Sequence, residues 1–310
     1  MNVSRLLKAG IKYLTSPDYR FLINAGLGAY NKMPDEEFLK RKFRACLGKE
    51  LNLDNPETFN EKLQWLKLYD RKPEYTMMVD KYLVRQYIAG KIGEEYLIPL
   101  LGVWDDPEDI DFDALPDQFV LKCNHNSGTG MCICKDKSKL DIHKVKRELK
   151  KGLAQDYYLT GREWPYKNVK RCIIAEQYIT NDGEAPNDYK FFCFGGKVKC
   201  FKIDYDRFKG HKANYYTPDG ELMRFGEVVC PPDFDRCVTL PQLKDDMIAL
   251  AEKLSAGYPF LRVDFYEIGQ QIYFGELTFF PASGLGLFEP KEWDRTLGSW
   301  IPLPNAKKED

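Results

Sequence analysis

Asp264 and Glu276 are the residues best placed to do chemistry, because both are predicted to lie on one hairpin. Polar and apolar residues alternate on both sides of Gly269, which predicts two antiparallel strands joined by a turn at Glu267–Gln270. In that register the two carboxylates are neighbours and can share a hard cation such as magnesium through their oxygens. Arg262 would lie on the same face as Asp264.

The surroundings of the two acids argue against the usual alternative, in which a carboxylate on a strand is simply solvated. Aromatic and aliphatic residues flank each acid in the runs RVDFY and YFGELTFF. A carboxylate in apolar company needs a cation or strong hydrogen-bond donors. The run PASGLG that follows contains Ser283 and Gly284, and glycine there permits a ligand to approach the backbone closely.

A second candidate site is a glycine-containing loop between two predicted strands, Phe119–Cys123 and Met131–Cys134. Such a loop can fold over phosphates, with its backbone amides donating to oxygens while Lys122 supplies positive charge from the strand. The loop residues concerned are Ser127, Gly128, Thr129 and Gly130. An ordinary turn has the same composition, so this alternative stays open.

The same segment contains ligand types suited to zinc, which is a rival interpretation. The residues are Cys123, His125, Cys132 and Cys134. Their spacing, C-x-H-x6-C-x-C, lacks the usual two to four residues between paired ligands. Burial as small apolar side chains on alternate strand positions explains the cysteines more simply.

A group of donors follows a predicted hairpin centred on Gly195–Gly196. Lys190 on the first strand of this hairpin is expected to share a face with Asp188. The segment RFKGHKANYY then reads as a loop, with donors at Arg207, His211, Lys212 and Asn214. This loop is either plain surface or a binding site for a phosphate or a substrate carboxylate.

Composition restricts the class of protein. The chain has 310 residues, of which 44% are hydrophobic and 14% aromatic, enough for a globular core in one large or two modest domains. Nine cysteines without a recognisable signal peptide predict reduced thiols in the cytoplasm. A net charge of −1 argues against nucleic-acid binding, and no apolar run approaches the roughly 18 residues that span a bilayer.

The combined motifs resemble those of the ATP-grasp ligases, in particular the TupA-like (teichuronopeptide-biosynthesis) proteins of bacterial polysaccharide gene sets. The resemblance covers about Thr58 to Leu303 and consists of six separated matches in the required order. They are Asp80–Lys81 at the start of a helix, Lys122 before the glycine-bearing loop, a hinge at Glu176, Gln177, Tyr178 and Ile179, Lys190 on its strand, the Arg262-x-Asp264 strand, and Glu276 followed by Ser283–Gly284.

The resemblance implies a role for each matched residue. ATP would be bound by Lys81, Lys122, the loop Ser127–Gly130 and the hinge Glu176–Ile179. Arg262 and Lys190 would be catalytic, and Mg²⁺ would be held by Asp264, Glu276 and Thr278. Thr278 stands where most of the superfamily has asparagine, so it would bind magnesium directly or through water. The substrate-binding candidates are Arg207, His211, Lys212, Asn214, Ser283 and Gly284.

The resemblance also implies an α+β fold in which two lobes hold ATP between antiparallel sheets. Residues 1–70 would be a helical N-terminal region, 71–180 the part of the ATP-grasp unit with the phosphate flap, and 181–310 the lobe with the metal site. The first helix is basic and amphipathic, and packing or partner docking is favoured over the alternative, contact with a membrane surface.

The implied activity is an ATP-dependent, ADP-forming carboxylate–amine ligase that acts through an acylphosphate. The expected substrates are a uronic acid of a polysaccharide or its precursor and an amino acid or amine. Two other classes stay open, a glycosyltransferase and a non-catalytic nucleotide-binding protein. A sugar transferase would also use two carboxylates and a metal, but it has no need of the glycine loop with Lys81 and Lys122.

Overall fold

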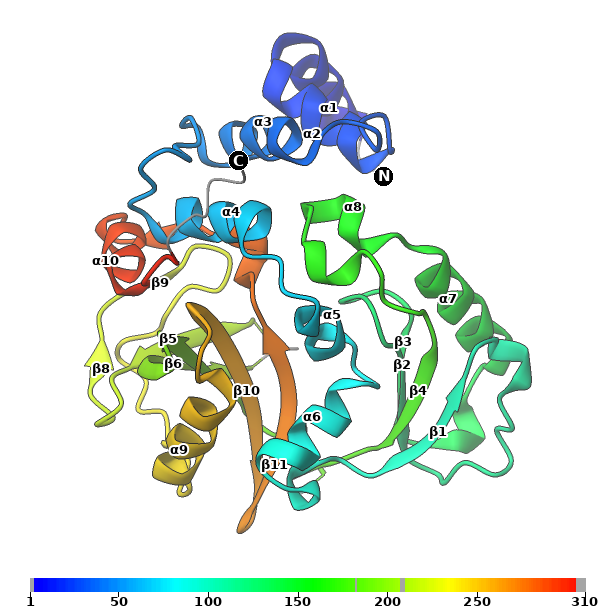
Figure 1. The fold of residues 1–310 in the computed structure, drawn as a ribbon. Coiled ribbons are helices and arrows are strands. Elements are labelled where there is room, and N and C mark those ends of the chain that lie inside the picture. Colours follow the sequence, from blue (N-terminus) through cyan, green and yellow to red (C-terminus); the bar gives the residue numbers. More distant parts are fainter. Residues whose placement is uncertain (1–2, 182, 207–209, 305–310) are drawn as a thin grey trace.

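The computed structural model describes residues 3–181, 183–206 and 210–304 (Figure 1). Within these residues the strands form three antiparallel sheets, of four, six and two strands. The two larger sheets lie on opposite sides of the helices α5 (Glu74–Val79) and α6 (Val84–Lys91), and the N-terminal helices form a separate layer. The expected α+β architecture with antiparallel sheets is therefore confirmed.

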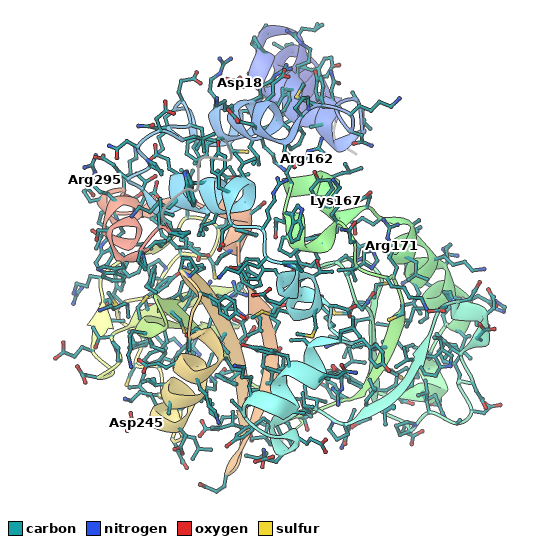
Figure 2. All side chains as sticks on the ribbon, viewed as in Figure 1. Asp18, Arg162, Lys167, Arg171, Asp245 and Arg295 are labelled. Carbon is teal, nitrogen blue, oxygen red and sulfur yellow. The ribbon has the colours of Figure 1, made fainter. Side chains whose placement is uncertain are left out.

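The N-terminal layer consists of α1 (Val3–Thr15), α2 (Pro17–Gly26) and α3 (Asp35–Leu47). Its apolar core contains Phe21, Phe38, Leu39, Phe43 and Leu51. Figure 2 shows Arg162 at the junction between this layer and α8 (Tyr157–Gly161). The Arg162 side chain is 1% exposed, donates to the Tyr30 carbonyl at 2.8 Å and stacks on the Phe38 ring, so it ties the helical layer to the remainder of the chain.

The four-stranded sheet has the order β1–β4–β2–β3. Its strands are β1 (Leu100–Trp104), β2 (Phe119–Cys123), β3 (Met131–Cys134) and β4 (Ile173–Gln177). Helix α7 (Ile142–Ala154) covers one face, where Leu121 and Ala175 pack with Leu149. Because side chains alternate along a strand, Lys122 and Glu176 project from the opposite face, toward α6.

Local features explain where two elements of this half of the chain begin. β1 starts at Leu100, after a 3-10 turn, η1 (Glu94–Tyr96), and Pro99. α7 starts at Ile142, because the Asp141 carboxylate caps it by accepting from the Lys144 amide at 2.9 Å.

The six-stranded sheet has the order β11–β10–β5–β6–β7–β8. Its strands are β5 (Asp188–Phe194), β6 (Lys197–Tyr205), β7 (Lys212–Tyr216), β8 (Leu222–Met223), β10 (Phe260–Ile268) and β11 (Gln271–Thr278). Helix α9 (Lys244–Ser255) packs on one face through residues such as Ala251 and Leu254. The opposite face carries the alternating polar residues, among them Lys190 and Asp264.

The prediction of a loop at Lys212 and Asn214 is wrong. These residues belong to β7, which pairs with β6 so that Ile203 is opposite Asn214. Residues 213–216 are all buried, and tyrosine-rich runs of this kind favour strands.

Helices α4 (Phe59–Tyr69) and α10 (Glu292–Trp300) pack together near a small sheet of β9 (Gly226–Glu227) and β12 (Phe288–Glu289). Thr58 begins α4 with a capping box shared with Glu61. The Phe59 ring meets Phe260 edge to face at 5.1 Å, so α4 belongs to the core of the six-stranded sheet. The division of the chain at residues 70 and 180 stays a prediction.

Across the described ranges, none of the helices has the length and apolar character needed to cross a membrane.

Candidate functional site

The predicted pairing of Asp264 with Glu276 is present in the structure. β10 and β11 are joined through Gly269 and Gln270, and Asp264 lies directly opposite Glu276. Gly269 has a φ of +59°, a conformation that glycine adopts without strain, which explains the tight turn. The Arg262 guanidinium contacts both acids, with Nε 2.7 Å from Asp264 Oδ1 and Nη2 2.9 Å from Glu276 Oε1.

Lys190 lies next to this trio because β5 pairs with β10, so that Lys190 is opposite Asp264. Its ammonium donates to Asp264 Oδ2 at 2.8 Å and also contacts Asp188. Burial alone would lower the pKa of Lys190, but attraction to Asp264 and Asp188 outweighs it and holds the pKa above its usual value. Burial would likewise raise the pKa of Asp264, yet Arg262 and Lys190 keep it lowered and the carboxylate charged.

The donor set fits a hard cation, since two carboxylates on neighbouring strands already converge on one cationic group. Asp264 is buried, whereas the side chain of Glu276 is 43% exposed and open to a ligand. The Thr278 hydroxyl donates to Glu276 Oε1 at 3.2 Å, so it orients that carboxylate. Direct binding of the metal by Thr278 stays a prediction.

A narrow cavity lies between α5, α6, β11 and the four-stranded sheet. Four of the predicted site residues line it, from four different segments: Lys81, Lys122, Glu176 and Glu276. Apolar side chains complete the wall, including Val79, Val84, Ile98 and Leu277. The cavity is therefore lined by cations, carboxylates and apolar side chains together.

Lys81 meets the glycine-containing loop. Its ammonium donates to the Asn126 carbonyl at 2.6 Å and its amide donates to the Asn124 carbonyl at 3.1 Å. Asp80 supports this position by accepting from the Tyr82 amide at 2.8 Å. Burial lowers the pKa of Lys81, and attraction to Glu276 partly offsets that effect.

The loop itself is fixed at its base and open at its tip. The Asn126 side-chain amide donates to the Gly152 carbonyl at 3.1 Å, whereas Ser127 and Gly128 are exposed. Gly130 has a φ of +66° and lies so close to Gly152 of α7 that a Cβ would clash with its backbone. The predicted phosphate flap thus has a rigid attachment and an accessible end, at Ser127, Gly128 and Thr129.

The predicted hinge is divided between two environments. Glu176 faces the cavity, with Oε2 2.5 Å from Lys122 Nζ and Oε1 3.5 Å from Arg85 Nη1. Gln177 and Tyr178 instead line a separate surface hollow beside Lys135. The Gln177 amide donates to the Pro99 carbonyl at 3.0 Å. Contact of Gln177, Tyr178 and Ile179 with adenine or ribose stays a prediction.

The predicted substrate-binding residues are only partly brought together. Arg207 lies outside the described residues. Asn214 is buried and bonded to the backbone of Asp233, accepting at 2.9 Å and donating at 2.7 Å, so its amide supports the adjacent segment. His211 contacts Asp204. The roles in substrate binding proposed for His211, Lys212 and Asn214 stay predictions.

The Ser283–Gly284 turn lies against α4. Ser283 has a φ of +55° and Gly284 a φ of +61°. Lys67 holds this turn, because its ammonium is 2.8 Å from the Ser283 carbonyl and 2.9 Å from the Ser283 hydroxyl. A left-handed conformation at a non-glycine residue is strained and persists only where its surroundings fix it. Binding of substrate by Ser283 and Gly284 stays a prediction.

Sequence reasoning missed several charged residues near the site. Arg85 lies four residues after Lys81, a spacing that brings two side chains to one side of a helical segment, and this signal was available. Lys67 and Glu163 are both buried. Asp204 shares the polar face of β6 with Lys202, as alternation predicts.

The zinc interpretation of Cys123, His125, Cys132 and Cys134 gains no support among the described residues. The Cys123 thiol contacts the Leu149 carbonyl, and the Cys134 thiol the Asp117 carbonyl. His125 Nε2 lies 3.0 Å from the Gln155 carbonyl. Within residues 3–181, 183–206 and 210–304, the three-residue group with metal-ligand atoms close together is Asp204, His211 and Cys230.

Comparison with solved structures found proteins of low sequence identity. The chain is similar to a D-alanine–D-alanine ligase from Bacillus anthracis complexed with ATP (16% identity, 66% of this chain and 54% of that one, TM-score 0.39). It is also similar to a D-alanine–D-alanine ligase from Helicobacter pylori (14% identity, 78% of this chain and 69% of that one, TM-score 0.44). The chain thus spans little more than half of the first protein. No curated protein matched.

The family model described as TupA-like ATPgrasp matches residues 61–302. This range nearly coincides with the span of the resemblance found by motif, and it includes the β10–β11 hairpin, the glycine-containing loop and β4. Membership supports the expected ATP-dependent, ADP-forming ligase. The chain belongs to the TupA-like ATP-grasp family.

Proposed function

We propose that the protein joins a carboxylated sugar to an amine at the expense of ATP, through an acylphosphate. The acid would be a uronic acid of a bacterial surface polysaccharide or its precursor, and the partner an amino acid or amine. The observation that carries this proposal is the convergence of Lys81, Lys122, Glu176 and Glu276 on one cavity beside the Asp264 and Arg262 pair. In this arrangement the lysines that would bind the triphosphate of ATP lie next to the carboxylates that would bind its magnesium ion.

Each group on the chain has a defined task in this reaction. When bound, ATP would supply the phosphoryl group and Mg²⁺ would neutralise its charge, with Asp264 and Glu276 as ligands. Lys81 and Lys122 would attract the phosphates. Arg262 and Lys190 would stabilise the charge that develops during transfer, because both are held in place before reaction. Positioning and charge stabilisation suffice for this class of chemistry, so no nucleophilic side chain is required.

Hydroxylamine tests the reaction class. It should replace the amine, because an acylphosphate reacts with any good nucleophile, and the product is then a hydroxamate. The purified protein is incubated with ATP, Mg²⁺, hydroxylamine and a panel of uronic acids, and hydroxamate, ADP and AMP are measured. Hydroxamate with equimolar ADP is expected. AMP with pyrophosphate would indicate adenylation instead, and sugar transfer without ATP consumption would favour the glycosyltransferase alternative.

Lys122→Ala is expected to weaken ATP binding by about 1.5–3 kcal/mol, the usual contribution of a hydrogen bond to a charged group. The ammonium of Lys122 lines the cavity, and its side chain is 20% exposed, so it is available to a phosphate. Isothermal titration with a non-hydrolysable ATP analogue measures the effect. Lys170→Ala, at an exposed lysine just before β4, is the control and should bind as the wild type does. Unaltered ATP affinity with lowered UDP-sugar affinity would reject the assignment.

A further inference from the structure

Asp204 and His211 form a carboxylate–imidazole pair on the polar face of the six-stranded sheet. Asp204 is 3% exposed, and its Oδ1 lies 3.4 Å from His211 Nε2. Among the described residues this oxygen accepts no hydrogen bond with good geometry. The His211 side chain is 39% exposed, so the ring is held on one side by a buried acid and is open to solvent on the other.

The pair is connected to the proposed phosphoryl-transfer site through one side chain. Lys190 Nζ lies 3.6 Å from Asp204 Oδ2 and 2.8 Å from Asp264 Oδ2. Asp204 is on β6, two strands away from the metal carboxylate on β10, which corresponds to about 10 Å between the two backbones.

A metal ion is the other possible use of this group, because Asp204, His211 and Cys230 offer donor atoms within 4.8 Å of one another. Two observations argue against it. The Lys202 ammonium lies 3.6 Å from the same Asp204 oxygen, where it would repel a divalent cation. Burial also raises the pKa of Cys230 to about 11, so the thiol is not the thiolate that zinc requires.

Amide formation needs a group that removes a proton. An amine that is protonated at neutral pH has no lone pair with which to attack, and histidine is the side chain suited to exchange a proton in that range. The charged groups around the pair are Lys190, Lys202 and Glu227, and Glu227 accepts from the Lys202 ammonium at 3.3 Å. Asp204 is thus placed to orient the ring and to stabilise its protonated form, as in other carboxylate–histidine pairs.

We propose that His211, oriented by Asp204, is the general base of the ligation step, an inference that rests on the proposed function. The amine nitrogen forms its bond to the acyl carbon while the bond from that carbon to the phosphate oxygen breaks. The phosphate leaves with the electron pair. His211 first removes one proton from the ammonium and passes it to water, which frees the lone pair. It then takes the second proton, released by nitrogen as the new bond forms, and returns it to the departing phosphate, so that atoms and charge balance.

The test compares two nucleophiles in one variant. Hydroxylamine is largely unprotonated at neutral pH and needs little help from a base, whereas an amino acid needs one. His211→Gln should therefore lower amide formation from a panel of the common amino acids by about 100-fold or more, and hydroxamate formation by less than about threefold. Asp204→Asn should lower amide formation by at least about tenfold, since the ring loses its orienting partner. His143→Gln, at an exposed histidine on α7, is the matched control.

Three outcomes would overturn the assignment. Equal losses of amide and hydroxamate in His211→Gln would show that His211 binds the acid or the phosphates. Wild-type protein that contains one equivalent of zinc, absent from His211→Gln, would show a metal site. Wild-type protein that forms no hydroxamate with any uronic acid would reject the proposed function itself, and this result is distinguishable because it appears before any substitution is made.

Discussion

Glu276→Gln is expected to abolish ATP-dependent ligation while the fold is retained. Glutamine keeps the size of the side chain but removes the charge that a magnesium ligand needs. The Glu276 side chain is 43% exposed, so its ion pair with Arg262 is not fully buried, and losing its charge should cost little stability. ADP release in the presence of both substrates should fall to background, while the denaturation midpoint stays close to that of the wild type.

Asp264→Asn should abolish the same activity but should also destabilise the protein. Asp264 is 2% exposed and accepts from both Arg262 and Lys190, so its removal leaves two buried cations short of an anion. Breaking a buried ion pair costs roughly 3–5 kcal/mol. Asp245→Asn is a control, since this acid at the start of α9 is exposed and distant from the site (Figure 2).

The metal assignment of the preceding prediction has its own contrary outcome. If Glu276→Gln released ADP at the wild-type rate, Glu276 would not be a metal ligand.

The local parts of the site were predictable from the sequence because they follow from strand alternation and turn chemistry. The β10–β11 hairpin, its register and the pairing of Asp264 with Glu276 agree with the prediction. The bounds of β2 and β3 agree as well, since apolar runs end at the glycine-containing loop. These features depend on residues close together in the sequence, where a period of two decides which side chains share a face.

Contacts between distant segments were not predictable in the same way. The bond from Lys81 to the Asn126 carbonyl joins two loops through tertiary packing, and no periodicity reports it. The residues of β7 were predicted to be a loop because glycine and lysine precede them. In the structure, pairing with β6 makes them a strand despite that local signal. No sequence signal marks Lys67 as buried. It is buried because α4 packs between the Ser283 turn and α8.

Lys67→Met is expected to destabilise the protein by about 2–4 kcal/mol, because several buried acceptors lose their donor at once. The ammonium is 2.9 Å from the Gly161 carbonyl and 2.8 Å from the Ser283 carbonyl, and it also contacts Gln64 Oε1 at 3.1 Å. Methionine fills a similar volume, so the loss is one of hydrogen bonding rather than of packing. Urea denaturation measures it, and Lys40→Met on the exposed face of α3 is the control, expected within about 0.5 kcal/mol of the wild type.

The deficit of Lys67→Met should grow as the pH is raised from 7 to 10. Burial lowers the pKa of Lys67 to about 7 in the folded protein, whereas the unfolded chain keeps the ordinary value of 10.5. Between these two values the unfolded state binds the extra proton, so the wild type gains stability with rising pH and the variant lacks that gain. A deficit that stays constant or shrinks as the pH rises would show that Lys67 keeps its proton in the folded protein.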